Sequence, residues 1–204
     1  MYFSRKALSL VLTIVFLLLF SSFAFAQSPQ TINLSAGFNF VSFTLAPTQT
    51  AQDLMAANSA IVDIFNYDTD SGTFFTAKDG IVRKLFYGQG YIIKAKSPLT
   101  ITLTGTIPTA PIGNIDLARG FNLIGISKSL SVRTKFSSIV NGNSMIEAMY
   151  AWDTDSGTYF RVTKSLVDLD SYILPGEAYF IKAVQNTTLN YDNGTFAIGG
   201  GTTP

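Results

Sequence analysis

The 204-residue chain contains neither cysteine nor histidine. It therefore has no thiol nucleophile, no zinc site of the usual Cys/His kind and no Ser-His-Asp triad. It also forms no disulfides, so its folded state must be stabilised by an apolar core. Glutamate is scarce too, because only Glu147 and Glu177 accompany eleven aspartates. These absences remove much of the catalytic repertoire, and the sequence predicts a protein that is not an enzyme and needs no cofactor.

An excess of charge of either sign is also lacking. The chain has 14 basic and 13 acidic residues, and its first 26 residues hold two of the basic ones, Arg5 and Lys6. Without that segment 12 basic and 13 acidic residues remain, which is a net charge of about −1. Proteins that bind nucleic acids usually carry a basic surface that neutralises phosphates. The charge balance therefore predicts no nucleic-acid partner.

Residues 1–26 have the pattern of a secretory signal peptide. Arg5 and Lys6 form a positive start, residues 8–20 are almost wholly apolar, and Ala24-Phe25-Ala26 is a small-x-small cleavage site. The alternative is an uncleaved membrane anchor, because the apolar stretch is long for a signal. No later run approaches the roughly 20 apolar residues that span a bilayer. We expect cleavage after Ala26, a secreted, periplasmic or cell-surface location, and no membrane contact after cleavage.

The remaining chain is duplicated. The hexapeptide Asp-Thr-Asp-Ser-Gly-Thr occurs at 68–73 and again at 153–158. Matching segments surround it, with an offset of 83 residues before it, 85 at it and 88 after it. The matched pairs before and after the hexapeptide are 32–43 with 115–126 and 85–95 with 173–183. We predict two repeats, 27–106 and 115–196, a linker at 107–114 and a flexible tail at 197–204.

Each repeat has the pattern of a small β domain. Two short alternating runs broken by Gly-Phe-Asn predict a strand, a tight turn or bulge, and a second strand. Gly37 and Gly120 are expected to supply a positive φ or room for close backbone approach. Thr50 begins a predicted helix in the first repeat, and helical spacing predicts another over Ser131 to Val140. Further alternating runs complete five or six strands per repeat. The predicted fold class is mainly β: two tandem β-sandwich-like repeats, each with one short helix.

The hexapeptide itself lies between two β-prone, aromatic-rich runs, which predicts a hairpin in each repeat. Asp68 is expected to accept hydrogen bonds from nearby backbone amides, and Gly72 to take the left-handed conformation that closes the loop. These roles account for the hexapeptide by turn chemistry alone.

A calcium site is the alternative interpretation of the hexapeptide. Asp68 and Asp70 in the first copy, and Asp153 and Asp155 in the second, are carboxylates spaced like those that open calcium-binding loops. The second copy fails the EF-hand pattern, because position twelve counted from Asp153 is Lys164 rather than an acidic residue.

Aromatic pairs adjoin both hairpins. Phe65 and Tyr67 lie two residues apart on one predicted strand, and Tyr150 and Trp152 do so on the other. Each pair therefore projects from one face of its strand. Such residues usually pack in a core or across strands. On an exposed face they could instead stack on sugar rings, and Tyr67 and Trp152 are the residues at equivalent places.

Three motifs follow one another in the second repeat: Gly-Phe-Asn-Leu-Ile at 120–124, Trp-Asp-x-x-Ser-Gly-Thr-Tyr at 152–159, and Pro-Gly-x-x-Tyr-x-Ile-Lys-Ala at 175–183. The first repeat carries close counterparts. This order resembles the β-rich Gly-aromatic-Asn-Leu repeat modules of secreted and surface bacterial proteins. The resemblance implies an extracytoplasmic module with no defined activity.

The sequence therefore favours an exported, noncatalytic binding or structural module of the cell surface or an extracellular assembly. Its expected partner is a protein or a polysaccharide at the cell surface. One alternative is a carbohydrate-binding module that uses Tyr67 and Trp152. Another is a small carboxylate-dependent hydrolase using Asp68 and Asp70, although carboxylates within one turn are poorly placed to flank a scissile bond.

Overall fold

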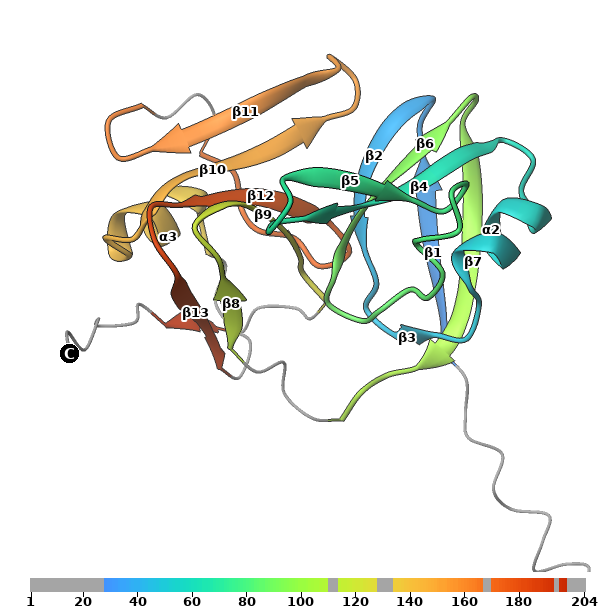
Figure 1. The fold of residues 1–204 in the computed structure, drawn as a ribbon, viewed down its shortest axis with the longest axis horizontal. Helices are drawn as coiled ribbons and strands as arrows, with labels where there is room; N and C mark the ends of the chain where they lie inside the picture. The colour runs from blue at the N-terminus through green and yellow to red at the C-terminus, as the bar shows by residue number, and fades with distance from the viewer. Residues whose placement is uncertain (1–27, 110–113, 128–133, 167–169, 193–194, 198–204) are drawn as a thin grey trace, which may run out of the picture.

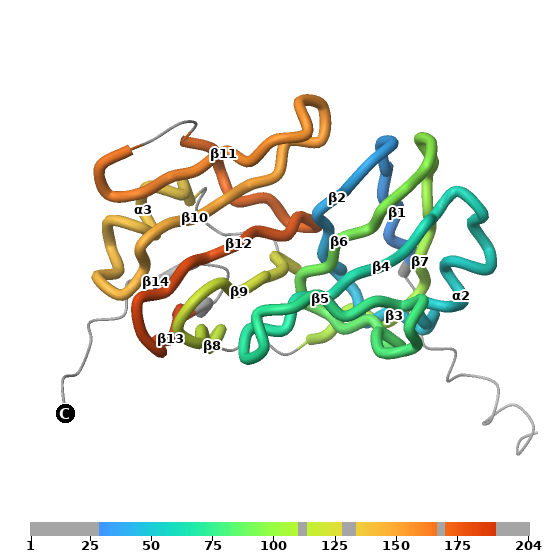
Figure 2. The backbone as a smooth tube through the Cα atoms, turned by 45° about the horizontal axis from the view of Figure 1, so that its top comes forward, coloured from blue at the N-terminus to red at the C-terminus, as the bar shows by residue number. Residues whose placement is uncertain are grey.

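A computed structural model describes residues 28–109, 114–127, 134–166, 170–192 and 195–197. The chain forms two halves with a similar order of elements, which lie beside each other (Figures 1 and 2). The first half contains β1 (Ser28–Leu34), β2 (Gly37–Ser42), β3 (Ala46–Pro47), α2 (Ala51–Ala57), β4 (Ile61–Asp68), β5 (Thr73–Thr76), β6 (Gly90–Ala95) and β7 (Leu99–Thr106). The second half contains β8 (Ile115–Leu117), β9 (Gly120–Gly125), α3 (Phe136–Gly142), β10 (Ile146–Asp153), β11 (Thr158–Thr163), β12 (Ala178–Ala183), β13 (Thr187–Asp192) and β14 (Thr195–Ala197).

Each half is built from two antiparallel sheets. The first half has a four-stranded sheet in the order β2-β6-β4-β5 and a three-stranded sheet in the order β1-β7-β3. The second half repeats the larger sheet as β9-β12-β10-β11 and has a smaller sheet β14-β13-β8. The predicted fold class, mainly β with one short helix per half, is confirmed.

Alternation along the strands separates two apolar faces of each larger sheet. On β6, Tyr91 and Ile93 point into a core shared with the smaller sheet and α2, because they pack with Ile101 of β7 and Leu54 of α2. The residue between them, Ile92, belongs to a different cluster that joins the two halves. The larger sheet therefore buries one face inside its own half and turns the other toward the second half.

The repeated Gly-Phe-Asn motif is a structural turn. Asn39 is buried, and its side chain accepts a hydrogen bond from Ser35 N and donates one to Ser35 O, both at 2.9 Å. Asn122 makes the same pair of bonds with Ala118, at 2.9 and 2.8 Å. Gly37 and Gly120 have φ values of 99° and 107°, so the predicted positive φ is confirmed. The asparagine thus supplies the polar partners that this buried turn requires.

The helices begin differently in the two halves. Thr50 and Asp53 form a reciprocal capping box at the start of α2, as the sequence predicts. The predicted helix from Ser131 is wrong in its start, because α3 begins at Phe136 and Lys135 is extended. Residues 131–133 lie outside the described residues. Lys135 is extended because its backbone forms an antiparallel bridge with Tyr172.

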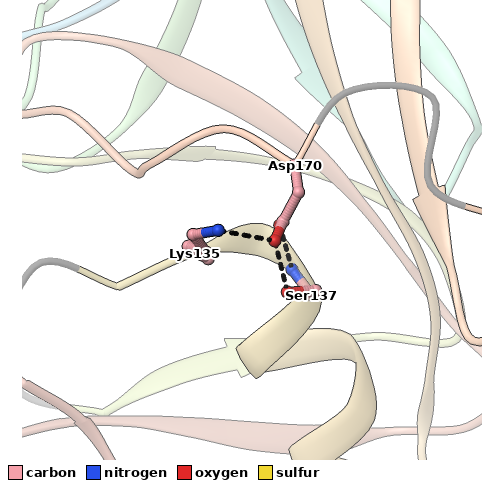
Figure 3. A network of polar contacts seen from close by, with 3 residues as sticks. All are labelled: Lys135, Ser137 and Asp170. Carbon is pink, nitrogen blue, oxygen red and sulfur yellow. Dashed lines mark hydrogen bonds and ion pairs between the residues drawn. The ribbon is translucent and has the colours of Figure 1, made fainter.

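A distant carboxylate supports the start of α3. Asp170 accepts hydrogen bonds from Ser137 N at 3.0 Å and Ser137 Oγ at 2.8 Å, and it pairs with Lys135 Nζ at 3.3 Å (Figure 3). The amide of Ser137, in the first turn of α3, thus gains a hydrogen-bond acceptor from another segment of the chain. The negative charge of Asp170 is also favourable at the N-terminal end of the helix.

Two buried tyrosines hold the loops that enter β6 and β12. Tyr91 Oη accepts from Phe86 N at 2.9 Å and donates to Gln89 at 2.8 Å. Tyr179 occupies the matching place, accepting from Leu174 N at 2.9 Å and donating to Glu177 at 2.6 Å. Burial raises the pKa of Tyr91 to about 12 and raises the pKa of Tyr179 further, with Glu177 adding to that rise.

These tyrosines should make the protein sensitive to alkali. The pKa of each is higher in the folded state than the roughly 10 of an unfolded tyrosine, so the stabilisation is complete below about pH 10. It is lost as pH rises through the folded-state pKa, which for Tyr91 is about 12. For Tyr91 alone the loss is on the order of 2–3 kcal/mol. Urea unfolding at pH values across this range would measure it. Tyr91→Phe should be less stable near neutral pH but lose less free energy of unfolding in alkali, and an unchanged alkaline loss would contradict the assignment.

Candidate functional site: an aromatic groove between the halves

The hexapeptide turns lie at the surface and have the predicted hairpin geometry. Gly72 and Gly157 have left-handed φ values of 67° and 65°. Asp68 accepts hydrogen bonds from Ser71 N and Ser71 Oγ, and Asp153 bonds Ser156 in the same way. The serine hydroxyl is the main cause that lowers the pKa of each aspartate. Both carboxylates are therefore ionised near neutral pH and hold their own loops.

Within the described ranges, no other acidic side chain joins these carboxylates to form a larger ligand set. Among the residues that the structure describes, no three Asp or Glu side chains gather where they could hold a metal ion. Each turn therefore offers two carboxylates, those of Asp68 and Asp70 in the first copy and those of Asp153 and Asp155 in the second. The calcium interpretation stays a prediction, and the geometry favours the structural turn.

The four predicted aromatic residues are brought together at one place, where the outer faces of the two larger sheets meet. Phe65 and Tyr67 come from β4, and Tyr150 and Trp152 come from β10. All four are half-buried. Each pair was predicted to lie on one face of its strand, and this agrees with the position of all four rings between the two sheets. The face is covered in part by the other half of the same chain.

Trp152 connects the halves directly. Its ring stacks on Phe40 of β2, with centroids 5.6 Å apart and an interplanar angle of 24°. Its indole nitrogen donates to Phe38 O at 2.7 Å. The ring of Tyr159 from β11 meets it edge-on at 4.8 Å. One face of Trp152 is thus covered by Phe40, and sugar stacking on this residue stays a prediction.

Phe180 of β12 lies at the middle of the junction. It is 7% exposed and clusters with Ile92, Leu123 and Ala178. Its ring makes edge-on contacts with rings from both halves, namely Phe40 at 5.9 Å, Tyr67 at 5.2 Å, Phe74 at 6.3 Å and Phe121 at 6.1 Å. Edge-on aromatic pairs add to the stabilisation that their buried area gives.

The meeting faces do not close completely, and two hollows remain between them. The larger has a volume of about 320 Å³ and is lined by Phe38, Phe40, Phe65, Phe74, Ile92, Trp152 and Tyr159. The smaller has a volume of about 290 Å³ and is lined by Tyr67, Phe121, Tyr150, Tyr159 and Phe180. We call the two hollows together the aromatic groove. Its walls are almost entirely rings and aliphatic carbon.

The two hollows are related by exchange of the halves. At the offsets of 83, 85 and 88 residues, Phe38 corresponds to Phe121, Phe65 to Tyr150, and Ile92 to Phe180. Backbone contacts follow the same exchange, because Val41 bridges to Glu177 while Ile124 bridges to Gln89. The junction is therefore approximately two-fold symmetric, as in a dimer of identical subunits.

Close backbone approach fixes this junction. Ser42 donates through N to Gly176 O at 2.8 Å and through Oγ to Ile126 O at 2.7 Å. Its counterpart in the second half is Gly125, where an added Cβ would lie 2.5 Å from Gln89 O and 2.6 Å from Ser42 Cβ. A side chain therefore fits at this position in one half only.

Sequence reasoning missed most of the groove. It identified the residues of β4 and β10 but not Phe38, Phe40, Phe74, Phe121, Tyr159 and Phe180, which complete the walls. The signal was available, because Phe38 and Phe40 lie two apart on a predicted strand and thus share a face. What the pattern could not indicate is that this face meets its counterpart in the other repeat.

No protein-family model, curated protein or solved structure matches this chain. Within the part of the chain that the structure describes, no helix has the length and apolar character needed to cross a membrane.

Proposed function

We propose that the protein is an exported, noncatalytic binding module and that the aromatic groove is its binding site. Export is inferred from residues 1–26, which lie outside the described residues. Noncatalytic binding is inferred from the composition and from the engagement of Asp68 and Asp153 in their own turns.

The observation that carries the proposal is the larger hollow. Concave sites lined by apolar and aromatic side chains with few polar groups are the usual form of small-ligand sites, and their volumes begin near 300 Å³. The hollow of about 320 Å³ lies at the low end of that range. Phe74 at its edge is 46% exposed although it is a large apolar ring. A ligand in the hollow would cover such surface.

The carbohydrate alternative has less support. Sugar binding combines an open aromatic face with polar groups that bond hydroxyls, whereas Trp152 is stacked on Phe40 and the walls of the hollow are apolar. The groove is better suited to an apolar group.

A neutral fluorescent probe tests the proposal. N-phenyl-1-naphthylamine should bind saturably and quench Trp152, the single tryptophan, by energy transfer. Phe74→Ala should weaken binding about fivefold to tenfold, because one lining ring is lost. Phe86→Ala is the matched control, since Phe86 is 56% exposed and does not line the groove.

Equal affinities for the two variants, or no saturable binding at all, would remove the groove as the site. Displacement of the probe by soluble oligosaccharides would instead support the carbohydrate alternative.

A further inference from the structure

The two halves place different charges beside their hollows. Lys94 of β6 lies opposite Phe38 in the β2–β6 register, and Nζ is 5.0 Å from the centroid of the Phe38 ring, which lines the larger hollow. Lys182 is the counterpart on β12, and its Nζ is 5.8 Å from the centroid of Phe121, which lines the smaller hollow. Each hollow thus has one ammonium group next to a lining ring.

Lys182 has a carboxylate partner, whereas Lys94 has none within the described part of the chain. Lys182 Nζ forms an ion pair with Glu147 at 2.8 Å. The residue at the place of Glu147 in the first half is Val62, which has no charge. Asp63 lies opposite Lys94 in the β4–β6 register, but it is buried, and its Oδ1 accepts hydrogen bonds from the amides of Ile64 and Lys78. Among the described residues, no carboxylate lies within ion-pair distance of Lys94.

We propose that the larger hollow binds an amphipathic monocarboxylate, with its aliphatic or aryl body against the rings and its carboxylate at Lys94. This inference rests on the proposed function of the groove and adds the charge of the ligand. The apolar walls supply affinity by burying hydrocarbon, and the unpaired ammonium supplies the preference for an anion. The smaller hollow lacks this preference, because Glu147 already neutralises Lys182.

A quaternary ammonium compound is a ligand of the opposite charge that an aromatic hollow could also bind. Cages of aromatic rings attract such cations through the negative faces of the rings. Lys94 already occupies a position over Phe38, and its positive charge repels a second cation nearby. Charge complementarity therefore favours the anion.

Three ligands of equal chain length separate these outcomes: decanoate, decanol and decyltrimethylammonium, each below its micelle concentration. Binding is followed by the fluorescence of Trp152 at low ionic strength and near neutral pH. Decanoate should bind about threefold to fivefold more tightly than decanol, and the cation more weakly than decanol. Added salt should reduce the difference between decanoate and decanol, because it screens a partly exposed charge pair.

Lys94→Gln should remove the advantage of decanoate and leave decanol binding unchanged. Lys182→Gln is the matched control, with the same chemical change at the paired lysine, and should alter the decanoate affinity less than twofold. Thermal unfolding of both variants would show that each is folded.

Equal binding of decanoate and decanol, or tighter binding of the cation, would overturn the anion proposal while leaving the groove as a binding site. Failure of all three ligands to bind would instead count against the proposed function itself. Equal effects of the two lysine substitutions would assign the preference to general charge rather than to Lys94.

Discussion

Phe180→Ala should lower the free energy of unfolding by about 3–5 kcal/mol, the range for deleting a buried phenylalanine ring. The loss is expected at the upper part of that range, because Phe180 contacts rings from both halves and its removal leaves a void between two rigid sheets. Urea unfolding measures the change. The emission of Trp152 should also shift to longer wavelength as water enters the junction.

Two substitutions control this result. Phe180→Leu retains most of the apolar volume and should cost clearly less, because the remaining void is smaller. Phe86→Ala removes the same ring from a site that is 56% exposed and should change stability by about 0.5 kcal/mol or less. If Phe180→Ala costs no more than Phe86→Ala, the two halves do not pack as described.

Gly125→Ala should destabilise the protein by about 2–3 kcal/mol, because the new methyl group meets backbone atoms that cannot move independently. The contacts are with Gln89 O at 2.5 Å and Ser42 Cβ at 2.6 Å, both in the other half. Relief requires the halves to move apart, so the variant should bind N-phenyl-1-naphthylamine differently and shift the emission of Trp152.

A double substitution tests whether the effect arises at the junction. Ser42→Gly removes one of the three atoms that lie within 3 Å of the added methyl group, so it should recover part of the loss when combined with Gly125→Ala. Ser42→Ala alone keeps Cβ and loses only the hydrogen bond to Ile126 O, which costs about 1 kcal/mol. Purely additive effects of Ser42→Gly and Gly125→Ala would show that the two residues do not contact each other.

Local features of the fold were predictable from the sequence because their causes are local. The hairpins follow from the Asp68–Ser71 and Asp153–Ser156 turns, and the start of α2 follows from Thr50 and Asp53. Alternation placed Phe65 with Tyr67, and Tyr150 with Trp152, on single faces. These relations join residues two or three positions apart, and over that distance backbone geometry alone decides which side chains meet.

The rest of the site depends on contacts between distant residues. Trp152 bonds the carbonyl of Phe38, which is 114 residues earlier in the chain. The bridge to Tyr172 holds Lys135 extended, and Asp170, 33 residues beyond Ser137, bonds the first turn of α3, so helical spacing alone placed that start too early. Nothing in the local pattern distinguishes an aromatic face that packs on its own half from one that packs on the other, and the groove was therefore predicted only in part.

The approximate two-fold axis has an evolutionary consequence. In a dimer of two identical chains, every substitution appears at both symmetric places, so the two hollows would have to change together. Here both halves belong to one chain, and each position mutates alone. One such divergence is seen beside the two lysines. Glu147 pairs with Lys182, whereas the corresponding residue in the first half, near Lys94, is the uncharged Val62. Covalent fusion of the repeats thus allows the two hollows to acquire different ligand preferences while they share one junction.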